Sequence, residues 1–240
     1  MKTAVIAVLL SCFAASVMAQ EPAAPKKWKE SAELSYVQTT GNSRTSTVSG
    51  KDLYTYDWKK AGLELAAGGL AAKDKGITNA EQYYASEKVS WKLTGKDYVF
   101  ERIGWDRNRF AGIKNRYDYS VGLGRDLVDL PNDKLLGEVG GGYIFEDRLH
   151  AKNLSYGSYR GHVKYIRTLS QTANASQDLE YIGNMSDHKG YRTNSETALI
   201  ASISTHFSLK ASYVWHYENS PAPGFKKSDT ITSMAVIVNY

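Results

Sequence analysis

Histidine is the side chain best suited to acid–base and metal chemistry near neutral pH, and the chain contains five of them. None lies in a His-x-x-x-His or His-Glu-x-x-His pattern, the local spacings that bring two imidazoles onto one metal ion. His162 and His216 fall on the polar side of alternating segments, where a hydrolase could pair them with serine or aspartate. Both partner types are frequent, so no local signature marks a site. We predict no catalytic residue, no metal site, no cofactor and no enzyme.

Lysine and arginine residues in the predicted loops are candidates for binding anions. Eight of them lie in six polar segments, which contain Asp74 as their one acidic residue. We expect this basic rim to face the phosphates of lipopolysaccharide, although it could also attract anionic solutes. The eight residues are Arg44, Lys75, Lys114, Lys152, Lys189, Arg192, Lys226 and Lys227.

Further charged residues of both signs alternate with apolar residues and are predicted to line a lumen. Three arginines, Arg102, Arg107 and Arg109, cluster in one segment and its following loop, and would bias a pore toward anions. The other candidates for the lumen are Glu138, Arg160, His162, Lys164 and Glu180. Mixed charges permit two outcomes, because the side chains either pair across the interior or face each other across a narrow aqueous pore.

The elements that must position these residues are β-strands, because apolar and polar residues alternate with a period of two from Trp28 to the end. Tyr117, Tyr119 and Val121, for example, alternate with Asp118 and Ser120. Twelve such segments are predicted, with no amphipathic helix between them. Their ranges are 28–38, 46–58, 61–73, 80–93, 98–110, 116–128, 135–149, 156–170, 174–187, 194–207, 209–219 and 229–240.

The connections between the segments are predicted to alternate between longer loops and tight turns. The longer set is 39–45, 74–79, 111–115, 150–155, 188–193 and 220–228, and the last of the short turns is placed near Ser208. The apolar side of the segments is rich in Tyr and Trp, which suits contact with lipid. The pattern therefore predicts an all-β fold, a single antiparallel up-and-down transmembrane β-barrel of twelve strands.

Three segments, 46–58, 80–93 and 98–110, contain residues that do not fit the alternation. Asp52 and Glu87 fall on the apolar side and are interpreted as β-bulges or errors of register. In 98–110, Val99, Ile103 and Trp105 favour one face, whereas Tyr98 and Phe100 favour the other. The glycine pair at 68–69 and the glycine triplet at 140–142 carry no phosphate-loop signature and are interpreted as room for large neighbours.

The first nineteen residues have the features of a secretory signal peptide, with Lys2, an apolar run and a Val-Met-Ala cleavage site. We expect export through the general secretory pathway, a polar lead-in at 20–27 and a barrel at 28–240. Cys12, the only cysteine, would be removed with the signal, or acylated if Leu9–Cys12 is a lipoprotein box. The aromatic strand ending at Val236, Val238 and Tyr240 resembles the signal by which outer-membrane barrels engage their assembly machinery.

The overall composition narrows the classes further. The 240 residues carry 30 Lys and Arg against 25 Asp and Glu, a formal charge of +5. A mean hydropathy of −0.43 excludes a bundle of membrane-spanning helices, since such helices need runs of roughly 20 apolar residues. An exported chain does not meet nucleic acid, so the basic balance is not attributed to nucleic-acid binding.

Four ordered motifs carry a family resemblance. They are Trp28 with Tyr36 and Gly41-Asn42-Ser43, the run from Arg102 to Ile113, the run Tyr117–Gly124, and Glu138–Tyr143. Together they resemble the salt-induced outer-membrane proteins, a family defined by a domain of unknown function. The resemblance implies an outer-membrane barrel linked to salt or envelope stress in a Gram-negative-type bacterium, and it brings no catalytic residues.

Three functions follow as hypotheses, in this order. The first is a narrow pore for small hydrophilic solutes, with a bias toward anions. The second is a non-conducting structural barrel that binds lipopolysaccharide and stabilises the outer membrane. The least favoured is an outer-membrane hydrolase.

Overall fold

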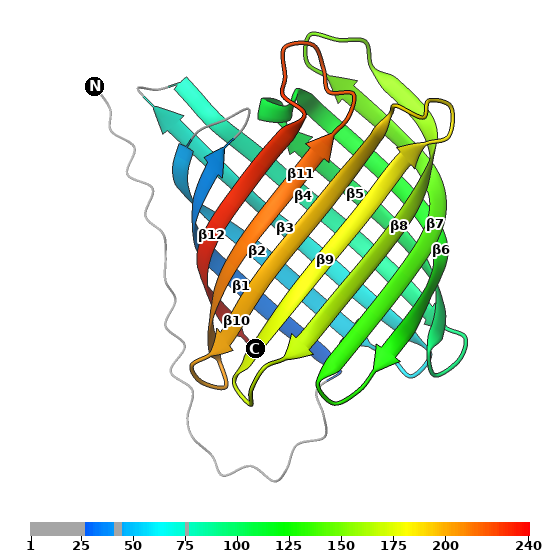
Figure 1. The fold of residues 1–240 in the computed structure, drawn as a ribbon, viewed down its shortest axis with the longest axis vertical. Helices are drawn as coiled ribbons and strands as arrows, with labels where there is room; N and C mark the ends of the chain where they lie inside the picture. Colours follow the sequence, from blue (N-terminus) through cyan, green and yellow to red (C-terminus); the bar gives the residue numbers. More distant parts are fainter. Residues whose placement is uncertain (1–26, 41–44, 75–76) are drawn as a thin grey trace.

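A computed structural model describes residues 27–40, 45–74 and 77–240 of the chain. They form twelve antiparallel β-strands that close into a barrel, together with one short 3-10 helix, η1 (Figure 1). The strands are β1 (Trp28–Thr40), β2 (Thr45–Asp57), β3 (Ala61–Asp74), β4 (Ile77–Lys92), β5 (Asp97–Asn108), β6 (Ile113–Asp129), β7 (Asp133–Arg148), β8 (Leu154–Thr168), β9 (Ala173–Asn184), β10 (Tyr191–Ser202), β11 (Phe207–Glu218) and β12 (Ser228–Asn239), and η1 is Arg109–Ala111.

Each strand pairs with its neighbours in sequence, and β1 pairs with β12 from Ser31↔Asn239 to Thr40↔Thr230. This last pairing leaves no free sheet edge, so every strand has two hydrogen-bonded neighbours. The predicted fold, a single up-and-down barrel of twelve strands, is confirmed. In the described ranges, no helix has the length and hydrophobicity needed to cross a membrane.

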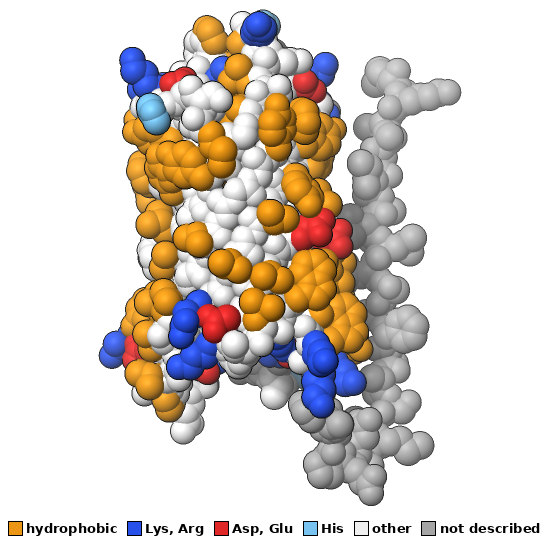
Figure 2. Space-filling view, turned by 90° about the vertical axis from the view of Figure 1, so that its right-hand side faces the viewer, with side chains coloured by type: hydrophobic (Ala, Val, Ile, Leu, Met, Phe, Trp, Pro, Cys, Tyr) orange, Lys and Arg blue, Asp and Glu red, His pale blue; other side chains and the backbone are white. Residues whose placement is uncertain are grey.

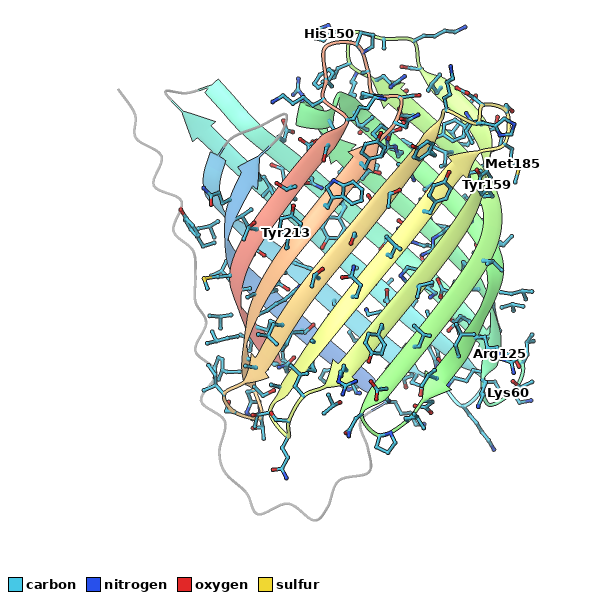
Figure 3. The ribbon with its side chains drawn as sticks, in the orientation of Figure 1. Lys60, Arg125, His150, Tyr159, Met185 and Tyr213 are labelled. Atoms are coloured by element: carbon cyan, nitrogen blue, oxygen red, sulfur yellow. The ribbon has the colours of Figure 1, made fainter. Side chains whose placement is uncertain are left out.

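The barrel has two distinct ends. We call the end with connections 58–60, 93–96, 130–132, 169–172 and 203–206 the turn end, and the opposite end the loop end. Lys60 and Arg125 lie at the turn end and His150 at the loop end (Figure 3). Two predicted boundaries are corrected. The turn placed near Ser208 lies at 203–206, and β10 begins at Tyr191, so it takes in residues predicted as loop.

The outer wall is apolar. Tyr117, Tyr119, Val121 and Leu123 of β6 are 45–58% exposed, and Figure 2 shows hydrophobic side chains over the middle of the wall with charged ones mostly near the ends. A soluble protein would bury this alternating set, so the outer wall is suited to lipid.

Tyrosines form a row on the outer wall toward the loop end. The ring centroids of Tyr159, Tyr181, Tyr191 and Tyr217, one from each of β8 to β11, follow at 6.0, 5.5 and 6.0 Å. Tyr159 is labelled in Figure 3, near the loop end of β8. Such rows are typical of the aromatic girdle at a membrane–water interface.

The structure settles the register of these three segments, which are β2, β4 and β5. Asp52 and Glu87 are exposed on the outer wall within regular pairing, so their interpretation as β-bulges or register errors is wrong. In β5, Ile103 faces outward and is 48% exposed, whereas Phe100 faces inward and is 2% exposed.

Glycines of β6 explain why aromatic rings of β5 fit inside the barrel. A Cβ on Gly124 would lie 2.2 Å from Tyr98 Cζ, and one on Gly122 would lie 2.7 Å from Phe100 Cζ. The two rings therefore occupy space that any larger residue on β6 would fill. A Cβ on Gly68 of β3 would likewise lie 2.8 Å from the ring of Tyr84 on β4. This confirms the prediction that the glycine pair leaves room for a large neighbour.

Packing of Tyr98 over Gly124 gives a test of this register. We expect Gly124→Ala to lower the free energy of unfolding by about 1–3 kcal/mol, because the ring cannot give way without leaving Glu138. Urea unfolding in lipid vesicles measures the change. Gly161→Ala, on β8, is the matched control, since nothing lies within 4 Å of its added methyl. Equal effects of the two substitutions would contradict the packing.

Candidate functional site

The interior of the barrel is built from charged side chains. Seven of them are less than 9% exposed, and their burial is possible only because each lies beside an opposite charge. These residues are Arg116, Asp118, Glu138, Glu146, Arg160, Arg192 and Lys210. Apolar packing is local by comparison, with Val37, Leu70 and Ile231 forming a small cluster between β1, β3 and β12.

Glu138 of β7 is the centre of the largest ion-pair network. Its carboxylate pairs with Lys88 of β4 and accepts hydrogen bonds from Arg160 Nη1 at 2.8 Å and from the Tyr98 hydroxyl at 2.6 Å. His162 Nδ1 lies 3.2 Å from the same carboxylate. One buried carboxylate thus joins four strands, β4, β5, β7 and β8.

Two flanking carboxylates extend this network to β9. Arg160 Nε donates to Glu180 at 2.6 Å, and Asn194 Nδ2 of β10 donates to the same carboxylate at 2.9 Å. His162 Nε2 lies 2.9 Å from Asp178, whose other oxygen is 3.8 Å from Lys164 Nζ.

Phe100 is the apolar support of the Glu138 network. Lys88 Nζ and the Arg160 guanidinium lie 5.2 and 5.6 Å from the centre of its ring. The ring is 2% exposed, so both cations are attracted to it away from water.

A second network crosses the barrel near the loop end. Arg116 of β6 donates to Glu146 of β7 at 2.8 Å and to Glu218 of β11 at 3.1 Å. Asp106 lies 3.8 Å from the same guanidinium. Because β6 and β11 lie nearly opposite each other in the strand order, the Arg116–Glu218 pair spans the lumen.

A third group joins β5, β6 and β10 across the lumen, toward the loop end. Arg192 Nη2 donates to Asp118 at 2.7 Å, and Arg102 Nη1 lies 4.0 Å from the other oxygen of Asp118. Lys210 of β11 pairs separately with Glu33 of β1 at 3.1 Å and with Glu196 of β10 at 2.7 Å.

The connection between β11 and β12, residues 219–227, covers the loop end. Ala222 is 1% exposed and packs with Phe225 against Gly112, beside η1 on the opposite side of the barrel (Figure 1). Arg148 Nη2 donates to the Ser220 carbonyl at 2.7 Å. These contacts hold residues 219–227 across the mouth, so we call this segment the lid.

Below the lid lies a cavity of about 420 Å³. It runs from Lys226 and Lys227 of the lid down to Glu33 and Lys51 of β1 and β2. Its charged lining is balanced, with seven cations and seven carboxylates. They are Lys51, Arg102, Arg116, Arg192, Lys210, Lys226 and Lys227 against Glu33, Asp106, Asp118, Glu180, Glu196, Glu218 and Asp229. A small hydrophilic solute would find partners of both signs there.

The structure places six of the eight predicted lumen residues inside the barrel: Arg102, Glu138, Arg160, His162, Lys164 and Glu180. The other two are corrected. Arg107 pairs in register with the outward-facing Tyr83, and its Nε lies 3.2 Å from Glu81, which Arg109 also approaches at 3.5 Å. Arg107 therefore faces the outer wall near the loop end, with the outward parity of β5, and Arg109 of η1 lies beside the same Glu81.

The predicted basic rim is wrong at one residue, Arg192. It was predicted in a loop, but β10 includes it and its side chain is buried in the lumen against Asp118. Lys114, Lys152, Lys189, Lys226 and Lys227 are exposed near the loop end. Arg44 and Lys75 lie outside the described residues, as do the predicted signal peptide 1–19, Cys12 and all of the lead-in 20–27 except Lys27.

Some lumen residues were missed by the sequence reasoning. Arg116 has the inward parity of Asp118 and could have been found from alternation alone. Arg148 likewise shares the inward parity of Glu146, but its contact with the lid could not have been found, because the position of the lid depends on the closed barrel.

Two of the five histidines, His162 and His216, contact polar side chains of the lumen. Both ring nitrogens of His162 contact carboxylates, and His216 Nδ1 lies 2.8 Å from Asn194 Oδ1. Over the described part of the chain, no group of three or more histidine or acidic side chains is placed to hold a metal ion.

Comparison with known sequences gives a family and a relative. Residues 32–240 match the family described as "Protein of unknown function, DUF481". The chain is 24% identical over 225 residues to the uncharacterized protein YdiY of Escherichia coli strain K12, covering 92% of this chain and 86% of that one.

Comparison with solved structures concerns the fold. The chain is similar to the NanC porin, with a TM-score of 0.58 and 10% identity over 86% of this chain and 98% of that one. It is also similar to the translocator domain of the autotransporter NalP from Neisseria meningitidis, with a TM-score of 0.52 and 10% identity over 91% and 90% of the two chains. The KdgM porin gives a TM-score of 0.50 at 10% identity over 87% and 99%.

The Glu138 network predicts a large loss of stability when its centre is neutralised. We expect Glu138→Gln to lower the free energy of unfolding by about 3–5 kcal/mol, because Lys88 and Arg160 would lose their shared buried counter-charge. Urea unfolding in lipid vesicles measures this. Asp57→Asn, which breaks the exposed pair with Lys92, should cost less than about 1 kcal/mol. A small effect at both positions would refute the stabilising role of the network.

Proposed function

The chain belongs to DUF481, a family of proteins of unknown function, so we propose its role from the structure of the barrel. We propose that it forms a narrow pore for small hydrophilic solutes in the outer membrane of a Gram-negative-type bacterium. The observation that carries this proposal is a cavity of about 420 Å³, with many charged side chains in its lining, inside a closed barrel with an apolar outer wall. Outer-membrane barrels that enclose an aqueous channel have an apolar outer surface and a polar interior.

The two ends of the barrel support an orientation. Outer-membrane barrels have short turns on the periplasmic side and longer loops outside the cell. In this barrel the longest connection in the described chain, the lid, lies at the loop end with η1 and the exposed basic residues. We place the loop end outside the cell, and the cavity then opens beneath the lid toward the exterior.

The lumen supports selection by size rather than unrestricted diffusion. Ion pairs across the lumen make the interior narrower than expected for a barrel of twelve strands. These pairs are Arg116–Glu218, Arg192–Asp118 and Lys88–Glu138. Since the cavity lining is balanced in charge, an anion bias would depend on local groups, and Arg102 is the one member of the predicted arginine cluster that lines the cavity.

A second candidate function is a non-conducting barrel that stabilises the membrane by binding lipopolysaccharide. The same cross-lumen ion pairs favour it, because they close the interior as well as constrict it. The exposed Lys114, Lys152 and Lys189 near the loop end would meet lipid phosphates in this case.

Several parts of the proposal stay predictions. They are the link to salt or envelope stress, the export pathway, the absence of enzymatic activity, and engagement of the assembly machinery by Val236, Val238 and Tyr240. In the structure, the Val236 and Tyr240 side chains are exposed and the Tyr240 amide donates to the Glu30 carbonyl at 2.9 Å.

Single-channel recording in a planar bilayer tests the pore. Refolded protein should give small, steady conductance, and Arg102→Gln should shift the reversal potential in a salt gradient toward cations, because it removes a cation from the cavity wall. Arg107→Gln is the matched control on the outer face of the same strand, and its reversal potential should equal that of the wild type. A silent bilayer with folded protein, verified by heat-modifiable gel mobility, would favour the structural barrel.

Removing the lid tests whether it covers the mouth. Replacing residues 220–226 by Gly-Ser-Gly should raise single-channel conductance at least about twofold, because the segment that packs against Gly112 would be lost. The same linker in place of residues 150–152 is the control, since that loop does not line the cavity. Unchanged conductance in the lid variant would show that the lid does not limit flow.

A further inference from the structure

Arg192, a residue of the cavity wall, has a buried hydrogen-bond donor without a partner. Its side chain is 9% exposed, and Nη2 is engaged by Asp118, but Nη1 is buried without a hydrogen-bond partner in the described part of the molecule. Arg192 lines the cavity. A buried guanidinium N–H that lacks an acceptor costs free energy, so such a group in a cavity wall is suited to an incoming acceptor.

Arg102 is the second under-used guanidinium of the cavity. Its nearest carboxylate is Asp118, at 4.0 Å, which is beyond hydrogen-bond distance. The side chain is 24% exposed and lines the same cavity. Asp118 therefore stands between two arginines, and only one of them holds it tightly.

Charge accounting separates this group from the others in the lumen. The Lys210 group has one lysine against Glu33 and Glu196, and the Arg116 group has Arg116 and Arg148 against Glu146, Glu218 and Asp106. Arg102, Asp118 and Arg192 instead carry two positive charges against one negative charge. Within ion-pair distance this group therefore holds one positive charge in excess, while Glu180 and Glu218 interact with Arg102 and Arg192 over longer distances.

We propose that Arg102 and Arg192 form an oxyanion-binding site in the lumen, which takes the carboxylate or phosphate group of a small soluble molecule. The proposal rests on the proposed pore function, because it names the class of solute that the cavity selects. Guanidinium groups present paired N–H donors that match the oxygens of carboxylate and phosphate. Cavity-lining Asn194, His216 and Glu180 could contact the remaining polar groups of such a solute.

The enclosed position of the site decides between soluble and lipid-borne oxyanions. Arg192 and Asp118 are buried inside the barrel wall, on the face opposite to the apolar surface that would meet lipid. A headgroup attached to acyl chains could not reach them without entering the lumen. The ligand is therefore a free solute, and inorganic phosphate and acetate are suitable probes for its two chemical forms.

Binding can be measured without any transport. We would titrate the refolded barrel, in a phosphate-free detergent, with inorganic phosphate and follow phosphorus NMR line broadening, with potassium chloride holding ionic strength constant. Acetate and inorganic phosphate should each compete for one saturable site. Arg102→Gln should weaken phosphate binding by about ten- to a hundredfold, which is the effect of losing a charged hydrogen bond.

Two further variants keep the test independent of folding. Arg192→Gln alone would strand the buried Asp118, so it is combined with Asp118→Asn, and the double variant should also lose phosphate binding at least tenfold. Lys51→Gln removes a positive charge from β2 in the same cavity and should weaken binding less than about threefold. Equal losses in Lys51→Gln and Arg102→Gln would overturn the site, since cavity potential alone would then explain binding.

The outcomes for the site and for the pore differ. Saturable phosphate binding in a barrel that gives no conductance would support the site and reject the pore. Conductance without saturable phosphate or acetate binding in the wild type would support the pore and overturn the site. Binding that neither Arg102→Gln nor the double variant weakens would also overturn it.

Discussion

A charge that leaves water must find a partner, and this constraint organises the barrel from within. The interior has little apolar packing, and what joins opposite walls is ionic contact between strands that are not neighbours in the sheet. Glu138 of β7 illustrates the principle, because side chains from β4, β5 and β8 all contact its carboxylate. Such pairs contribute less to stability than apolar packing of equal volume, but they specify which groups can meet.

The sheet and the networks depend on each other through parity. A strand that slipped by one residue would turn its apolar side chains into the lumen and its charges outward. The charges could then no longer reach their partners across the barrel. Glycines of β6 add a second constraint on register, since Tyr98 and Phe100 fit only where Gly124 and Gly122 oppose them. Register is thus specified by both sides of the wall.

Alternation made the fold predictable from the sequence, because a period of two is a local property of each strand. It also assigned Glu138, Arg160 and His162 to the lumen. It failed at the strand ends, where Arg107, Arg109 and Arg192 were misplaced, since neither the start of β10 nor the face of a residue beside a bulge follows from local pattern. The partners within the lumen were beyond sequence reasoning. Parity says that Arg116 and Glu218 both point inward, but only the closed strand order brings β6 opposite β11.

The cross-lumen pairs have a consequence for how the protein reaches its native state. Arg192 and Asp118 are separated by 74 residues along the chain, and Arg116 and Glu218 by 102. No hairpin contains both members of either pair, so a partly assembled sheet carries these charges without their counter-ions. Their stabilisation arrives only when the sheet curves far enough to bring β6 opposite β10 and β11. These ion pairs are therefore late contributions to assembly, because contacts of large sequence separation cost more loop-closure entropy than hairpin contacts.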